Sequence, residues 1–215
     1  YSAYRVGTLD AQARDKFAAP PYSEGAVLPG RTDLVPFAID LKNGTASPKE
    51  RLSKRASLTF KVMPMLGCIG VAPSGDRAPT SGPAGAYGGN LDYKEIREGA
   101  IVTLPVSVRG AYLFLGDGHA LQGDGEAVGS GIETSLDVKF TVDLRKNVHL
   151  TDPRVENAEY IISIGARTAI NRSLNDALTI ANSDMMRWLV EDYGIEPIAA
   201  HLLIGHEAKY DVAAL

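Results

Sequence analysis

Residues 111–126 read AYLFLGDGHALQGDGE, an apolar run that passes directly into a segment of glycine and acidic residues. The apolar half is typical of a buried strand. Glycine permits sharp turns and the close approach of a ligand, and four glycines frame Asp117, His119, Asp124 and Glu126 in the second half. The stretch therefore predicts a strand that ends at a tightly bent, acidic segment.

The flanking segments predict further strands. Apolar and polar residues alternate through 136–144, which is the pattern of a half-buried strand, and EYIISI at 159–164 predicts another. IVTLPVSV (101–108) and AYLFLGDG (111–118) predict two neighbouring strands joined by a turn at Arg109-Gly110.

The C-terminal part of the chain predicts helices. Apolar residues recur at spacings of three and four from Leu174 to Leu189, after a capping residue at Ser173 and before Gly194, and a shorter helix is expected to start at Pro197. Strands followed by helices, without regular alternation, predict an α+β fold. We expect mainly antiparallel β structure, sandwich-like, with the C-terminal helices packed on it.

Residues 1–56 contain five prolines and few periodic runs, and they predict a loop-rich N-terminal arm. A strand is expected near residues 58–62, so that 57–215 forms the main domain. Within it, the Gly/Pro/Ser-rich segment 72–90 predicts a long loop, and loops of this length are commonly functional or disordered.

Composition excludes some partners. The chain has 45% hydrophobic and 22% charged residues and a formal net charge of -4. It therefore lacks the excess of basic residues that is typical of nucleic-acid-binding proteins. No apolar stretch reaches the ~20 residues of a membrane helix, so no membrane partner is expected. A lone cysteine, Cys68, fits a reducing compartment and predicts a cytoplasmic protein. The first residue is Tyr1 rather than Met, which leaves a secreted, processed product as the alternative.

Three explanations fit the composition of the acidic segment. Carboxylates with an imidazole suit a divalent cation such as zinc, or calcium if carboxylates dominate. His119 beside carboxylates also suits a general base, and Asp and Gly are preferred in tight turns for local reasons alone. Two further Gly-framed acidic segments, GAYGGNLDYKE (85–95) and GIETS (131–135), favour a site over turn chemistry.

Four motifs, MLGCIGVAP (65–73), GAYGGNLD (85–92), GDGHALQGDGE (116–126) and GIE (131–133), occur in an order and spacing that resemble the acetamidase/formamidase family. The resemblance implies metal-assisted hydrolysis of a small aliphatic amide, formamide or acetamide, to ammonia and a carboxylic acid. It also implies a sandwich-like β fold with appended helices.

The resemblance carries site residues onto this sequence. The catalytic residues that the resemblance implies are Glu133, Glu126 and Asp117. The implied metal ligands are Asp92, His119 and Glu133, with zinc as the expected metal and calcium as the alternative. The implied substrate-binding residues are Asn90, Gly89 and Gly118. Backbone N–H groups of the glycine-rich turns would stabilise the oxyanion.

Several alternatives stay open. A Cys68 nucleophile is a minor option, because a reactive thiol needs an electropositive, accessible setting. A non-catalytic binding or structural sandwich that keeps the Gly-rich scaffold is the main competing function, and hydrolysis of a different C–N bond is a third.

Family members carry a further N-terminal region that the arm 1–56 does not match. The domain 57–215 is therefore expected to be incomplete by itself. We expect it to associate as a homo-oligomer or with a separate N-terminal fragment, which would cover open strand edges.

Overall fold

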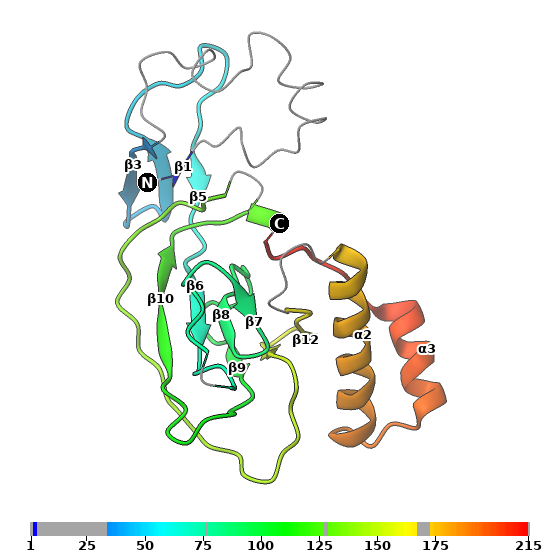
Figure 1. Ribbon diagram of the computed structural model, residues 1–215. Coiled ribbons are helices and arrows are strands. Elements are labelled where there is room, and N and C mark those ends of the chain that lie inside the picture. The colour runs from blue at the N-terminus through cyan, green and yellow to red at the C-terminus, as the bar shows by residue number, and fades with distance from the viewer. Residues whose placement is uncertain (1, 4–33, 76, 127–128, 167–172, 215) are drawn as a thin grey trace.

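The computed structural model describes residues 2–3, 34–75, 77–126, 129–166 and 173–214. These residues form four sheets of short strands, and two α-helices follow at the C-terminal end (Figure 1). The strands are β1 (Ser2–Ala3), β2 (Leu34–Val35), β3 (Phe37–Asp40), β4 (Thr45–Pro48), β5 (Phe60–Lys61), β6 (Met65–Gly70), β7 (Ala84–Gly85), β8 (Gly88–Asn90), β9 (Ile101–Thr103), β10 (Phe114–His119), β11 (Arg154–Glu156) and β12 (Ile161–Ser163). The helical elements are the short 3₁₀ turn η2 (Asp124–Glu126), α2 (Leu174–Glu191) and α3 (Pro197–Glu207).

The paired strands in the described part of the chain are antiparallel. Together with the two C-terminal helices, they confirm the predicted α+β, sandwich-like class. The strand predicted within 159–164 is confirmed as β12.

The sheet that carries the candidate site has the order β10-β6-β8-β7, so β6 lies between β10 and β8. Along one edge of β6, His119 pairs with Met65 and Gly116 with Cys68. Along the other edge, Cys68 pairs with Asn90 at the end of β8. The ends of β10 and β8, which are remote in sequence, therefore both lie along β6 between Met65 and Cys68.

A second sheet, β12-β11-β9, supports the turn that follows β8. Val155 in β11 is completely buried and packs with Leu91, Tyr93 and Ile96. This apolar cluster anchors the segment on both sides of Asp92, and burial of such side chains contributes roughly 1.5–3 kcal/mol each.

Strands β3 and β4 lie within residues 1–56, the range expected to form a loop-rich arm. They make a hairpin whose turn is stabilised by Asp40, since its Oδ1 accepts the backbone N–H groups of Lys42 and Asn43. Gly44, with φ of 63°, completes the turn. Strand β5 pairs with β4, so the expected boundary between residues 56 and 57 falls inside this sheet. Residues 1 and 4–33 of the arm lie outside the described residues.

The predicted hairpin across Arg109-Gly110 is wrong. Strand β9 pairs with β11, whereas β10 pairs with β6 in a different sheet. Pro105 lacks an N–H group and cannot extend the β9 ladder. Ala111 and Tyr112 then adopt positive φ values of 55° and 53°, so regular strand geometry resumes only at Phe114.

The predicted strand within 136–144 is also wrong, since these residues form no strand in the structure. Their apolar side chains Val138, Phe140, Val142 and Leu144 are exposed instead. Alternation alone cannot make a strand without a neighbouring strand to accept its hydrogen bonds, and no described segment pairs with this one.

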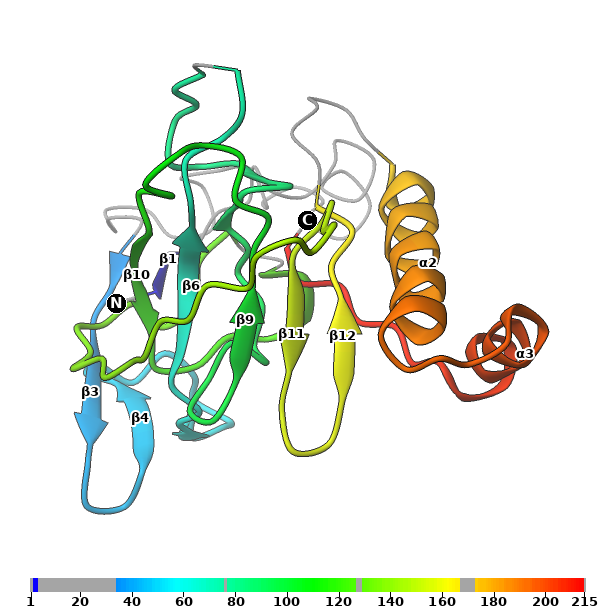
Figure 2. The same ribbon diagram turned by 90° about the horizontal axis from the view of Figure 1, so that it is seen from below.

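The predicted helices are confirmed as α2 and α3. Ser173 forms a capping box with Asp176, the last turn of α2 is followed by Gly194 with φ of 66°, and Pro197 occupies the first turn of α3. Helix α2 lies beside β12, where the Ser163 hydroxyl donates to the Ala181 carbonyl at 2.6 Å, and α3 lies outside α2 (Figure 2).

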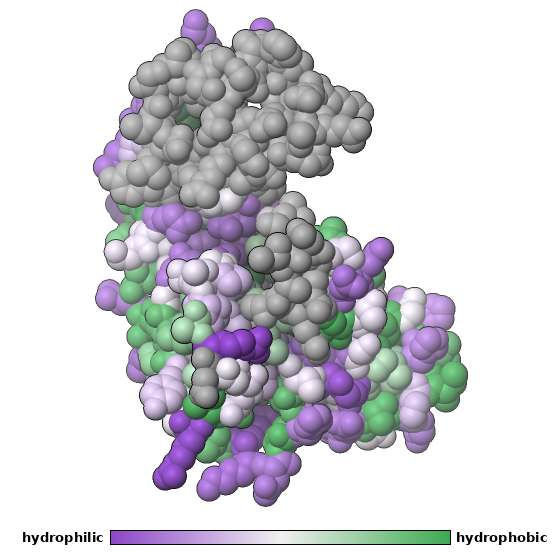
Figure 3. Space-filling view, viewed as in Figure 1, coloured by the Kyte–Doolittle hydropathy of each residue, from purple (hydrophilic) through white to green (hydrophobic). Residues whose placement is uncertain are grey.

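Helix α3 leaves apolar side chains uncovered. Ile198 is 69% exposed and Leu202 52% exposed, and apolar colour reaches the edge of the molecule where α3 lies (Figure 3). Within the described residues, neither helix combines the length and hydropathy that a membrane span requires.

Candidate active site

The site is built over a single glycine, Gly67, in the middle of the sheet. The backbone N–H of Asp92, two residues after β8, donates to the Gly67 carbonyl at 2.9 Å. On the opposite edge of β6, Asp117 lies between Gly116 and Gly118, which pair with Cys68 and Leu66. Asp92 and Asp117 therefore approach Gly67 from opposite sides.

The absence of a side chain at Gly67 makes this convergence feasible. A Cβ atom there would lie 2.5 Å from Asp92 Oδ1 and 2.6 Å from Asp117 Oδ2, which is too close for any real contact. Both aspartates have left-handed backbones, with φ of 44° and 60°. Asp tolerates this conformation better than most residues, and such backbone outliers cluster at functional sites.

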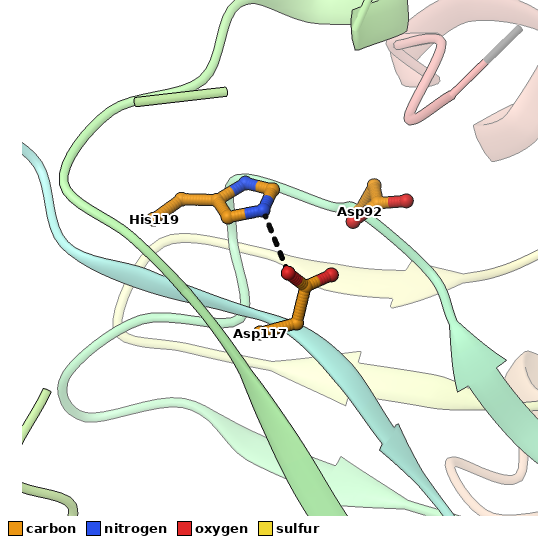
Figure 4. A group of neighbouring side chains, drawn as sticks. All are labelled: Asp92, Asp117 and His119. Atoms are coloured by element: carbon orange, nitrogen blue, oxygen red, sulfur yellow. Dashed lines mark ion pairs between the residues drawn. The ribbon is translucent and has the colours of Figure 1, made fainter. Parts of the chain in front are cut away.

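His119 forms the third side of the site. Its side chain is 1% exposed, and its Nε2 lies 3.3 Å from Asp117 Oδ1 and 3.1 Å from Glu133 Oε2. Figure 4 shows the imidazole facing Asp117, with the Asp92 carboxylate beside them. A backbone bridge between His119 and Glu133 positions the glutamate, whose Oε1 accepts a hydrogen bond from Ser130.

Burial and charge shift the ionisation of these groups. Burial, followed by the charges of Glu126 and Asp117, raises the pKa of Asp92 to about 7. Burial alone would lower the pKa of His119, but Glu133 and Asp117 outweigh it and raise this pKa to about 9. Burial raises the pKa of Glu126, whereas His119 outweighs burial at Glu133 and lowers its pKa.

Among the described residues, two buried atoms of the site, Asp92 Oδ1 and His119 Nε2, have no well-formed hydrogen bond. The carboxylates of Glu133 and Asp117 lie within ion-pair distance of Nε2, at 3.1 Å and 3.3 Å. A buried polar atom without a partner costs about 1–3 kcal/mol. A cation bound between these two atoms and the Asp117 carboxylate would supply the partner that each of the two atoms lacks.

In the described part of the chain, the side chains that could bind a metal ion form two groups, which share His119. One group is Asp92, Asp117 and His119; the other is His119, Glu126 and Glu133. Within each group the ligating atoms lie within 4.8 Å of one another. Of the expected ligands Asp92, His119 and Glu133, the two carboxylates thus belong to different groups. Oxygen donors with one imidazole suit a divalent cation such as zinc.

The expected substrate-binding residues lie at the site with structural contacts of their own. Asn90 donates from Nδ2 to Asp92 Oδ2. Gly118 is packed so tightly that a Cβ would lie 2.8 Å from the Thr134 carbonyl oxygen, and Gly89 has φ of 98°. Their glycine identity therefore has a steric reason as well.

Cys68 is half-buried in β6 next to Gly67. Burial and then the charges of Asp117 and Asp92 raise the pKa of its thiol. A raised pKa opposes formation of the thiolate nucleophile. Asp124, which also belongs to the opening motif, pairs at the surface with Lys94 at 2.5 Å and is not part of either ligand group.

Sequence reasoning missed Gln122. It is buried, and its Oε1 lies 2.8 Å from His119 Nδ1. Its Nε2 donates to the backbone carbonyls of Asp92 and Ala213. A neutral amide three residues after the histidine carries no charge or motif signal, although its place inside GDGHALQGDGE could have raised the question.

Comparison with known families gives one match to a family model. Residues 75–166 match the Acetamidase/Formamidase family, a range that contains Asp92, Asp117, His119, Gln122 and both glutamates of the site. No curated protein matches the chain.

Solved structures of similar proteins extend the likeness. An acetamidase from Yersinia enterocolitica is 35% identical, with a TM-score of 0.69, and the match covers 87% of this chain and 52% of that one. A recombinant predicted acetamidase/formamidase from Thermoanaerobacter tengcongensis is 34% identical, with a TM-score of 0.62 and coverage of 78% and 52%. An acetamidase from Bacillus halodurans is 32% identical, with a TM-score of 0.68 and coverage of 79% and 57%.

This chain spans about half the length of these relatives. The matched segment nevertheless contains every member of the two candidate ligand groups found in the described part of the chain, and the structural likeness extends over most of the chain. The family model and the structures point to the same family: residues 75–166 match the acetamidase/formamidase family, and most of the chain resembles solved acetamidases.

Proposed function

We propose that this chain provides the active site of an enzyme that hydrolyses a small linear amide, formamide or acetamide, to ammonia and the carboxylic acid. The observation that carries the proposal is the convergence of Asp92, Asp117 and His119 over Gly67, with two buried ligating atoms left without partners. The names of the similar structures, two acetamidases and a predicted acetamidase/formamidase, support the substrate class.

The residues fit a divalent cation, zinc in our proposal, held by Asp92, Asp117 and His119, with Glu133 as a further candidate ligand. Such a cation, when bound, would lower the pKa of a water molecule toward ~7 and polarise the amide carbonyl. Asp92 and His119 are buried while Asp117 is partly exposed, so the site is open to solvent on the Asp117 side.

The two glutamates fit the proton transfers that amide hydrolysis needs. The attacking water must lose a proton, and the amide nitrogen must gain one before ammonia leaves. The pKa of Glu133 is lowered and that of Glu126 is raised. When the surroundings lower the pKa of one carboxyl group and raise that of another, the first is suited to act as a base and the second as an acid. We therefore assign Glu133 as the base and Glu126 as the acid.

Asn90 and the backbone at Gly89 and Gly118 are our candidates for holding the substrate. They lie on β8 and β10, on either side of β6. Backbone N–H groups at such bends would stabilise negative charge on the carbonyl oxygen.

The test is ammonia release from formamide and acetamide by the purified protein, with a chelator and after zinc is restored. We expect turnover that the chelator abolishes and zinc returns. Zinc binding without ammonia release from either amide would favour the competing function, a binding or structural sandwich. Release from another C–N substrate alone would favour a hydrolase of different specificity.

We also propose that the chain works as part of a larger assembly, as a homo-oligomer or with a separate polypeptide. The exposed apolar residues of 136–144 and of α3 support this proposal, because large exposed patches commonly mark interfaces. Size-exclusion chromatography that shows a stable monomer of 22.9 kDa would contradict it. The single cysteine supports a reducing compartment, the cytoplasm in our proposal.

A further inference from the structure

Gln122 connects three parts of the site that are remote in sequence. Its side-chain amide contacts His119 Nδ1, the carbonyl of Asp92 and the carbonyl of Ala213. Gln122 is 5% exposed and His119 is 1% exposed, so water does not compete for these contacts. A buried amide with all its contacts made is well suited to hold another side chain in place.

The contacts determine which way the amide of Gln122 points. The carbonyl oxygens of Asp92 and Ala213 can only accept hydrogen bonds, so the NH₂ group of Gln122 must face them. Its Oε1 therefore faces His119 Nδ1 at 2.8 Å. Since Oε1 can only accept, Nδ1 must carry the proton.

This arrangement opposes the tautomer that the nearby carboxylates would select. Glu133 Oε2 and Asp117 Oδ1 lie 3.1 Å and 3.3 Å from Nε2, and both are acceptors. Without Gln122, a neutral His119 would place its proton on Nε2 and direct it at these carboxylates. The partner of one ring nitrogen of a histidine determines which atom the other ring nitrogen presents to a metal.

We propose that Gln122 is a positioning residue, which keeps the proton of neutral His119 on Nδ1 and presents the Nε2 lone pair toward Asp117 and Asp92. The inference deepens the proposed function and rests on it for its purpose, the binding of a cation at Nε2. The tautomer itself is a property of the metal-free chain and is measurable by itself.

The C-terminal segment 211–213 completes this arrangement. The Gly125 N–H donates to the Val212 carbonyl at 2.6 Å, and the Tyr93 hydroxyl lies 3.4 Å from Asp211 Oδ2. These contacts hold the Ala213 carbonyl against Gln122. The segment that follows α3 is thereby coupled to His119 through one amide.

The first test is the ring-nitrogen chemical shifts of His119 in isotope-labelled, metal-free protein, recorded up to the alkaline pH at which the spectrum shows a neutral ring. Wild type should show the Nδ1–H tautomer. Gln122→Leu, which removes the acceptor, should shift the ring toward Nε2–H. Gln122→Glu keeps an acceptor oxygen and should retain Nδ1–H. The same tautomer in wild type and in a folded Gln122→Leu protein would overturn the proposal.

The second test is zinc affinity, measured by competition with a chromophoric chelator. Partners of metal-binding histidines typically change affinity by about 10–100-fold when they are removed, and we expect a loss of this size for Gln122→Leu and a smaller loss for Gln122→Glu. If Gln122→Leu does not fold, Gln122→Met, of nearly the same length, takes its place. Equal affinity in wild type and either variant without the acceptor would overturn the inference.

The two tests separate the inference from the function it serves. Wild-type protein that binds no zinc would overturn the proposed metal-assisted hydrolysis. The tautomer comparison would then still decide the role of Gln122, because it uses metal-free protein.

Discussion

The carboxylates of Asp92 and Asp117 meet over the same glycine, although β8 and β10 carry them to opposite edges of β6. The strand between them would normally keep them apart with a side chain of its own. Gly67 has no side chain, so the two carboxylates occupy the space above it, and its backbone forms the floor of the site.

Gly67→Ala should therefore weaken zinc binding. Its Cβ would contact both carboxylate oxygens at 2.5–2.6 Å and push them apart, and we expect a loss of zinc affinity of about 10–100-fold, the size seen when ligand orientation is disturbed. Gly116→Ala is the matched control, because a Cβ there meets nothing within 4 Å. Equal zinc affinity in both variants, by chelator competition, would contradict the geometry.

The stability of the metal-free protein should fall as pH rises. Folding raises the pKa of Asp92 from 3.8 to about 7 and that of His119 from 6.5 to about 9. A raised pKa contributes stability below the unfolded value and loses it as pH rises through the folded value. We thus expect the melting temperature to decline from about pH 4 to about pH 9.

Zinc should reverse this decline, since it binds deprotonated ligands and its affinity grows over the same pH window. Calorimetry with and without zinc across the window checks both statements. Asp92→Asn, which cannot ionise, should show a smaller decline without metal. A flat melting temperature in metal-free wild type would refute the assignment of these shifts.

Glu133→Gln and Glu126→Gln should each lower kcat for amide hydrolysis, because an amide side chain can neither take nor supply the proton. General acid–base groups contribute about 10²–10⁴-fold to rate, and we expect losses in that range. Glu98→Gln, at an exposed position, serves as the control. Ammonia release by folded variants at wild-type rates would remove both glutamates from the mechanism.

Asp184→Ala should strongly destabilise the packing of α2 against the second sheet. Arg154 in β11 donates to both Asp184 carboxylate oxygens at 2.8 Å and 3.0 Å, and both residues are buried. Removing Asp184 leaves the buried Arg154 guanidinium with only the partly exposed Asp192 as a described ion-pair partner, and loss of a buried partner costs about 3–5 kcal/mol. Urea unfolding monitored at Trp188, whose ring lies 4.7 Å from the Arg154 guanidinium, measures this cost.

The matched control for that prediction is Asp192→Ala. Asp192 also pairs with Arg154, at 3.3 Å, but its side chain is 42% exposed. Solvent screens such a pair, and its loss should cost below about 1 kcal/mol. Similar losses of unfolding free energy in the two variants would mean that the buried Arg154–Asp184 pair stabilises the protein no more than the exposed pair does.

Features that depend on neighbouring residues in the chain were predictable from the sequence. The Ser173 cap, the apolar spacing of α2 and the Pro197 start of α3 act over one or two helical turns. The acidic, glycine-rich motif likewise indicated a site, because its composition is unusual whatever it folds against. Family resemblance then connected the separate motifs.

Strand partners could not be predicted in this way. The alternation of 136–144 looks like that of a paired strand, yet no described segment pairs with it. Likewise β9 and β10 look like a hairpin, yet each pairs with a strand that is distant in sequence. Gly67 and Gln122 show the same limit within the site, since neither carries a charge that marks it in the sequence. The sequence by itself determined the helices and the chemical nature of the side chains proposed to bind the cation, because these follow from local spacing and residue type. Only the tertiary structure decided that Asp92, Asp117 and His119 meet above Gly67 and contact Gln122, because their approach depends on the register of three antiparallel strands.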